Sequence, residues 1–159
     1  MRYEHLIEVN DPRVPLLPVV TREQLWRGLV RRAEQPWEFI FGLNGAQVHE
    51  RAADGEHTWL TRTLDFGNFQ VQDRVRLSPP HETRIETHAS AQFPASTLTI
   101  RIEEPAPQQL YLRFVYASAA IDGQGELDAM AVELRNQAYE QADLDTLGRI
   151  RALVDSGQL

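Results

Sequence analysis

The sequence contains no proline after Gly125, and this feature constrains the fold most strongly. From Glu126 to Val154 the chain consists mainly of alanine, leucine, glutamate, glutamine and arginine, which are all strong helix formers. The segment therefore predicts one helix of about 28 residues, ~42 Å long at the usual rise per residue. A helix of this length can cross a whole sheet.

Six successive strands are predicted between Gln47 and Ser118, before this helix. Apolar and polar residues alternate there, and clusters rich in glycine, proline and aspartate interrupt the alternation. The expected strands are residues 46–53, 57–66, 69–78, 83–89, 96–103 and 108–118, with turns at 54–55, 67–68, 78–81 and 104–107. Because short turns rather than helices join consecutive strands, an antiparallel sheet is predicted.

The N-terminal segment adds one strand and one helix. Residues 3–9 alternate with a period of two, which indicates a seventh strand. Thr21 and Gln24 have the spacing of a capping box, so a helix is predicted from Arg22 to Gln35. Its apolar stripe is expected to pack inward and its arginines to lie in solvent. The stripe is Leu25, Trp26, Leu29, Val30 and Ala33, and the arginines are Arg22, Arg27, Arg31 and Arg32.

This order of elements predicts one α+β domain over residues 1–159. A curved seven-stranded antiparallel sheet would wrap around the long C-terminal helix, with a short helical segment after the first strand.

Charge and composition argue against several partners. The net charge is −7, with 23 acidic against 16 basic residues, so the chain would repel a nucleic acid. The sequence contains no cysteine, which fits a reducing compartment, and we expect a cytoplasmic protein. No stretch approaches the roughly 20 apolar residues that span a bilayer, so membrane insertion is not expected.

The motifs of metal and cofactor sites are missing from the sequence. The five histidines lack the close spacings of metal ligands, and no phosphate-binding loop, dinucleotide fingerprint or nucleophile elbow occurs. We therefore predict no metal and no cofactor, and no residue is assigned a catalytic role.

An internal cavity is predicted from small residues on the long helix. One stripe of its first half is half alanine and consists of Leu127, Met130, Ala131, Leu134, Ala138 and Ala142. If this stripe lies in the concave face of a curled sheet, the alanines leave a hollow unfilled. The alternative is that bulky sheet residues such as Phe69, Phe114 and Tyr116 fill the space.

The hairpin at Gly67-Asn68 predicts a buried ion pair. A two-residue loop that begins with glycine favours a type II′ turn, which fixes the pairing of the flanking strands. Arg62 then lies opposite Asp73 in an otherwise apolar double row. Since either charge buried alone would cost several kcal/mol, we expect the two side chains to pair on the concave face. The pair would be a polar handle for a ligand or, alternatively, a structural brace.

Three segments resemble the AtaL-like branch of the START superfamily, also called the SRPBCC or helix-grip superfamily. They are residues 4–12, 21–29 and 136–143, with the sequences EHLIEVNDP, TREQLWRGL and NQAYEQAD. The superfamily includes the major birch-pollen allergen and bacterial polyketide cyclases, and its order of elements is similar along nearly the whole chain. The resemblance implies a helix-grip fold with a hydrophobic pocket between the sheet and the long helix. It implies no particular catalytic residue.

The leading functional prediction is the binding of a small hydrophobic or amphipathic molecule in this cavity, by a monomer or a homodimer. Arg62, Asp73 or a tyrosine hydroxyl would orient the polar end of the ligand, and Arg62 would suit a carboxylate or an enolate. The expected ligand-binding residues are Arg62, Asp73, Phe69, Val71, Leu112, Phe114, Tyr116, Met130, Leu134 and Tyr139.

Two other functions stay open. A cyclase or hydratase would use the same groups for proton transfer on an aromatic or polyketide-like substrate. An interaction protein without a ligand would instead have a filled interior and a large exposed apolar patch.

Overall fold

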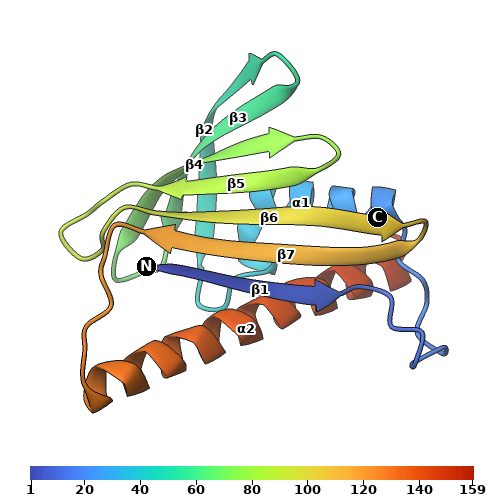
Figure 1. Ribbon diagram of the computed structural model, residues 1–159. Coiled ribbons are helices and arrows are strands. Elements are labelled where there is room, and N and C mark those ends of the chain that lie inside the picture. The colour runs from blue at the N-terminus through green and yellow to red at the C-terminus, as the bar shows by residue number, and fades with distance from the viewer.

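The computed structural model describes all residues, 1–159, and shows one curved sheet with two helices on its concave face (Figure 1). Its seven strands are all paired antiparallel, in the spatial order β1-β7-β6-β5-β4-β3-β2. The strands are β1 (Arg2–Glu8), β2 (Gly45–Asp54), β3 (His57–Asp65), β4 (Gln70–Ser78), β5 (Glu82–Thr87), β6 (Ser96–Ala106) and β7 (Gln109–Ser118). The helices are α1 (Arg22–Glu34), the short 3₁₀ helix η1 (Pro36–Glu38) and α2 (Glu126–Asp155). The predicted fold class is confirmed.

Helix α1 begins where the sequence predicts because Thr21 caps it. The Thr21 hydroxyl accepts a hydrogen bond from the Gln24 amide (3.1 Å), and the Gln24 side chain accepts one from the Thr21 amide (3.0 Å). The helix packs against β5 and β6, behind the sheet in Figure 1. It thus covers part of the concave face.

The β3–β4 hairpin has the predicted turn and register. Gly67 has a φ of 87° and Asn68 does not have a positive φ, as a type II′ turn requires. The Phe66 amide donates to the Phe69 carbonyl (3.0 Å). With this register, Arg62 is the direct cross-strand partner of Asp73.

The turn expected at residues 104–107 lies later in the chain than predicted, directly before β7. Strand β6 continues to Ala106, and its register shifts between Glu103 and Ala106. A β-bulge tolerates proline because it leaves a residue without a ladder hydrogen bond. Pro105 therefore stays in the strand, and the chain turns at residues 107–108, where Gln108 has a φ of 67°.

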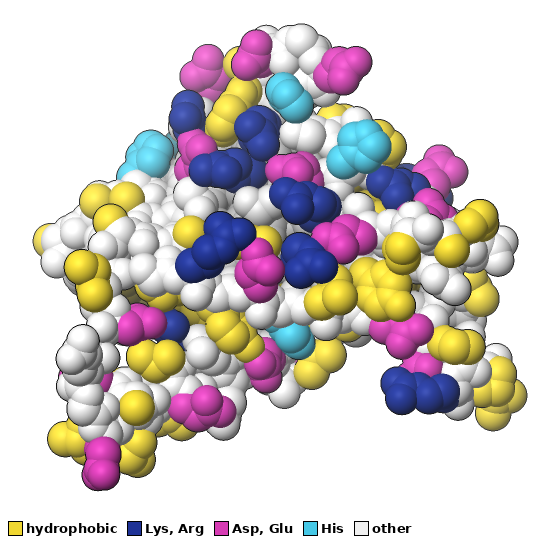
Figure 2. Space-filling model, in the orientation of Figure 1, with side chains coloured by type: hydrophobic (Ala, Val, Ile, Leu, Met, Phe, Trp, Pro, Cys, Tyr) yellow, Lys and Arg dark blue, Asp and Glu magenta, His cyan; other side chains and the backbone are white.

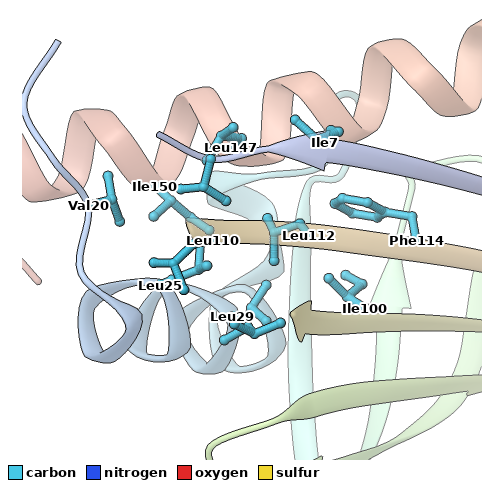
Figure 3. Packing of buried hydrophobic residues seen from close by; sticks show 12 residues of the cluster. Ile7, Val20, Leu25, Leu29, Ile100, Leu110, Leu112, Phe114, Leu147 and Ile150 are labelled. Carbon is cyan, nitrogen blue, oxygen red and sulfur yellow. The ribbon is translucent and has the colours of Figure 1, made fainter. Parts of the chain in front are cut away.

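The main hydrophobic core fills one end of the concave face, which we call the packed end. Figure 3 shows side chains from β1, β6, β7, α1 and the C-terminal half of α2 in contact there. The helices approach closely, since a Cβ added to Gly28 would lie 2.7 Å from Cγ1 of Ile150. The buried members of this core are Ile7, Val9, Val20, Leu25, Leu29, Ile100, Ile102, Leu110, Leu112, Phe114, Leu147 and Ile150.

Helix α2 is one continuous helix of 30 residues, but its alanine-rich stripe does not face the sheet. Leu127, Met130 and Leu134 are 82%, 61% and 64% exposed. In Figure 1 the N-terminal half of α2 lies apart from the strands. The predicted rotation of the helix is therefore wrong. Asp143 points inward instead, because a buried carboxylate needs hydrogen-bond partners and Tyr116 of the sheet supplies one.

The outer face of the sheet carries charges of both signs and no helix. Figure 2 shows arginine and acidic side chains interspersed over the strands. Salt bridges join Arg74 to Glu86 (2.7 Å) and Arg101 to Glu82 (3.2 Å) on neighbouring strands. An apolar ligand would therefore find a suitable surface only on the concave face. No helix has the length and apolar composition that crossing a bilayer requires.

Candidate ligand-binding cavity

An open cavity of about 460 Å³ occupies the other end of the concave face, which we call the open end. It lies between the inner side of β3–β7, the end of α1 and Tyr139 of α2, and 12 of its 20 lining residues are hydrophobic. Both its volume and its mixture of many apolar and few polar groups are typical of small-molecule sites.

The cavity exists because the helices cover only part of the sheet. At the packed end, α1 and the C-terminal half of α2 bury the inner side chains of β1, β6 and β7. The N-terminal half of α2 diverges from the sheet and leaves the inner side of β3–β5 uncovered. The predicted hollow is thus present, but its cause is the path of the helix and not the size of its alanines.

The structure brings six of the ten expected ligand-binding residues to the cavity. Leu112 and Phe114 lie in the packed end instead and are fully buried there. Met130 and Leu134 lie on the solvent side of α2. Leu112 and Phe114 miss the cavity because of their position along β7. Only the last inward-facing residues of this strand extend past the core and reach the cavity. The residues that line the cavity are Arg62, Asp73, Phe69, Val71, Tyr116 and Tyr139.

The ion pair predicted from the hairpin is present and buried. Arg62 donates from Nε to Oδ1 of Asp73 (2.9 Å) and from Nη2 to Oδ2 (2.7 Å), and both side chains are at most 2% exposed. Its Nη1 donates to the carbonyl oxygen of Ala33 (2.7 Å). All three nitrogens of Arg62 therefore have partners inside the protein. This geometry favours the structural brace, which joins β3 and β4 to α1, over a free handle for a ligand.

A second polar cluster, made of Tyr116, Asp143 and His5, joins the sheet to α2. The Tyr116 hydroxyl donates to Oδ1 of Asp143, and Nδ1 of His5 lies 3.1 Å from Oδ2. Burial raises the pKa of Asp143 from 3.8 to about 6, against the opposing effect of these two hydrogen bonds. Burial also raises the pKa of Tyr116 well above its usual range, so its hydroxyl stays protonated. A carboxyl that changes charge near neutral pH thus lies beside the cavity.

Aromatic rings line the cavity in two groups. Phe66 and Phe69 are stacked with ring centroids 5.1 Å apart, and Phe93 lies 5.4 Å from Phe69. Tyr116 and Tyr139 are stacked at 3.9 Å with an interplanar angle of 7°. Aromatic faces of this kind offer favourable contacts to a flat apolar molecule.

Arg32 is a cavity residue that the sequence interpretation missed. It was expected in solvent, but its guanidinium lines the cavity, and its Nε is buried without a hydrogen-bond partner. A signal for this position was present, because Arg32 follows Leu25 by seven residues and Leu29 by three. These spacings place it in the middle of the inward stripe of α1.

The curved sheet, the long C-terminal helix and the open cavity between them define a helix-grip fold. A sequence profile of the AtaL family, described as acetylaranotin biosynthesis cluster protein L, matches residues 7–157. The chain belongs to the AtaL family, as the resemblance of its sequence predicted. No curated protein matches it significantly.

Solved structures with the same fold have low sequence identity to the chain. The di-domain aromatase/cyclase StfQ from the steffimycin biosynthetic pathway has a TM-score of 0.67 and 10% identity, over 98% of this chain and 51% of that one. The Zhui aromatase/cyclase from a Streptomyces species has a TM-score of 0.55 and 16% identity, over 97% and 95%. For Ara h 8.0201 the values are 0.55 and 10%, over 98% of both chains. The chain spans about half the length of StfQ, and at these identities the similarity establishes the fold alone.

Proposed function

We propose that this protein binds a small amphipathic molecule in the cavity at the open end. The observation that carries the proposal is an apolar hollow of about 460 Å³ with polar groups on its wall. Unfilled apolar space lowers the stability of a fold, because the lining atoms lose packing partners. A binding role explains why the hollow is kept open.

The lining residues have different parts in this proposal. Phe69, Val71 and Tyr139 surround the apolar body of the ligand. Arg62 and Asp73 hold the wall in place through their mutual ion pair and do not bind the ligand directly. The similar fold of StfQ and Zhui, which are named aromatase/cyclases, supports a small-molecule role for this fold.

Native mass spectrometry of the protein purified from its own host tests the proposal. We expect the folded protein to carry a small molecule that is released on denaturation. Val71→Trp fills the cavity and is expected to abolish this adduct. Gln72→Trp is the matched control, because Gln72 follows Val71 in β4, is exposed and points to the opposite face. An adduct that survives Val71→Trp would show that the cavity is not the binding site.

A cyclase is the second candidate function, and the cluster of Tyr116, Asp143 and His5 favours it. A carboxyl with a pKa of about 6 beside a substrate cavity is suited to general acid–base catalysis near neutral pH. The saturated pair of Arg62 and Asp73 is not available for proton transfer. A poly-β-ketone offered to the protein would then lose water as a ring closes, which mass spectrometry detects. The Asp143→Asn variant should bind the same compound without converting it.

An interaction protein without a ligand is less well supported. That reading required a filled interior, whereas the structure contains an open cavity. Its second requirement, exposed apolar surface, is met by Leu127, Met130 and Leu134 on α2.

The proposal retains the domain organisation, compartment and oligomeric state that were expected from the sequence. We propose that residues 1–159 act as one domain in the cytoplasm, as a monomer or a homodimer. Size-exclusion chromatography with light scattering determines which of the two forms is present.

A further inference from the structure

Arg32 differs from every other arginine of the molecule in having no partner. The chain contains 16 arginines and no lysine. Apart from Arg32 and Arg151, each forms a salt bridge. Arg151 donates to the main-chain carbonyls of Pro18 and Val9. Arg32 makes neither kind of contact, and its Nε is buried without a hydrogen bond.

The two buried carboxylates near Arg32 are both engaged elsewhere. Asp73 accepts two hydrogen bonds from Arg62. Asp143 has one oxygen on Tyr116 and the other on His5. Neither forms a salt bridge with Arg32. The guanidinium therefore lies at the cavity wall as a positive charge without an internal anion.

The surroundings act on this charge in both directions. Burial lowers the pKa of Arg32 most, and the positive charge of Arg62 lowers it further, whereas Tyr116, Asp143 and Asp73 raise it. An arginine nevertheless stays protonated at neutral pH. A partly buried cation without a partner contributes nothing to the fold that an uncharged side chain would not, so its presence at the cavity points to a ligand.

We propose that Arg32 is the anion anchor of the cavity and that the ligand combines an aromatic body with one acidic group, a carboxylate or an enolate. This inference rests on the proposed function, because it names the class of molecule that the cavity takes. The planar guanidinium can donate two parallel hydrogen bonds to such a group. The stacked rings of Phe66 with Phe69, and of Tyr116 with Tyr139, would contact the apolar body. The role that the sequence suggested for Arg62 thus belongs to Arg32.

Two fluorescent probes with the same ring skeleton test the inference. Anilinonaphthalene sulfonate is an anion, and phenylnaphthylamine lacks its charged group. We expect Arg32→Gln to weaken binding of the sulfonate about tenfold or more. Binding of the neutral probe should change less than about twofold, because its contacts are apolar. Naphthoate is expected to displace the sulfonate from the wild-type protein at lower concentration than naphthylmethanol does, because only naphthoate carries an acidic group.

Arg27→Gln is the matched control. It removes the same charge from the same helix, but Arg27 is half exposed and paired with Glu23. Its effect on both probes should stay within about twofold, since exposed charges act weakly at a distance. Val71→Trp should remove binding of both probes, which places them in the cavity.

The melting temperature of Arg32→Gln distinguishes an anion anchor from a residue that stabilises the fold. Because Arg32 has no partner to lose, Arg32→Gln should melt at the temperature of the wild-type protein or above it. A clear drop in melting temperature would show that Arg32 stabilises the fold and would contradict the inference.

The outcomes separate the two proposals. Arg32 is not an anion anchor if Arg32→Gln weakens the binding of both probes equally or of neither probe. The same holds if Arg27→Gln weakens binding of the sulfonate as strongly as Arg32→Gln does. In each of these cases the cavity remains a binding site. If neither probe binds the wild-type protein, the proposed function fails together with the inference.

Discussion

The packed end and the open end of the concave face are held together by different forces. At the packed end, α1 and the C-terminal half of α2 contact each other so closely that Gly28 lies directly against Ile150. At the open end, polar contacts hold the wall, namely Arg62 with Asp73 and Tyr116 with Asp143. Apolar packing stabilises the filled end, whereas charge-assisted hydrogen bonds hold side chains that lack packing partners on their cavity side. In this protein, specific polar contacts frame the cavity.

The largest effect is expected from breaking that frame. Arg62→Met leaves Asp73 buried without its partner and should lower the free energy of unfolding by about 3–5 kcal/mol. Urea denaturation measures the loss. The double variant Arg62→Met/Asp73→Leu removes both charges and should recover most of the stability. A loss below about 1 kcal/mol in the single variant would mean that the open end needs no polar brace.

The two halves of α2 should respond differently to the same kind of truncation. Ile150→Ala creates a cavity in the packed end and should cost about 2–5 kcal/mol. Leu134→Ala removes a side chain that is 64% exposed and should change stability by less than about 0.5 kcal/mol. Thermal denaturation of the two variants gives the comparison. Equal losses would show that the N-terminal half of α2 packs against the protein in solution.

The pH dependence of stability tests the electrostatics of the open end. Below the ordinary pKa of 3.8, Asp143 is protonated in both the folded and the unfolded protein, and above about 6 it is ionised in both. Because the pKa of Asp143 is raised in the folded protein, its contribution to the free energy of unfolding is largest in acid. This contribution is lost as the pH rises through about 6. Between about pH 4 and about pH 7, the wild-type protein should lose roughly 2–3 kcal/mol relative to Asp143→Asn.

Carbon-13 NMR of the carboxyl group provides the control for this prediction. It follows the titration of Asp143 directly and should give a midpoint near 6. A midpoint near 4 would contradict the burial of a charged carboxyl at this site.

The smallest change in stability is expected at the contact between α1 and α2 in the packed end. Gly28→Ala places a methyl group 2.7 Å from Ile150, which is fully buried and cannot move aside, and should cost about 1–3 kcal/mol. Gly148→Ala is the matched control, because a Cβ at Gly148 meets no atom within 4 Å. This second change should raise stability by about 0.5–1 kcal/mol through helix propensity. Urea denaturation of both variants should therefore give changes of opposite sign.

The elements, their order and the register of one hairpin follow from local sequence. Thr21 and Gln24 form the helix cap, and Gly67-Asn68 sets the hairpin that places Arg62 opposite Asp73. These features are predictable because each depends on residues only a few positions apart. The rotation of α2 depends on tertiary contacts, since that helix carries apolar residues on both faces. Its inward face depends on the partners that β1 and β7 offer to Asp143, more than 20 residues away in the sequence. The path of α2 in turn leaves the cavity open and Arg32 without a partner.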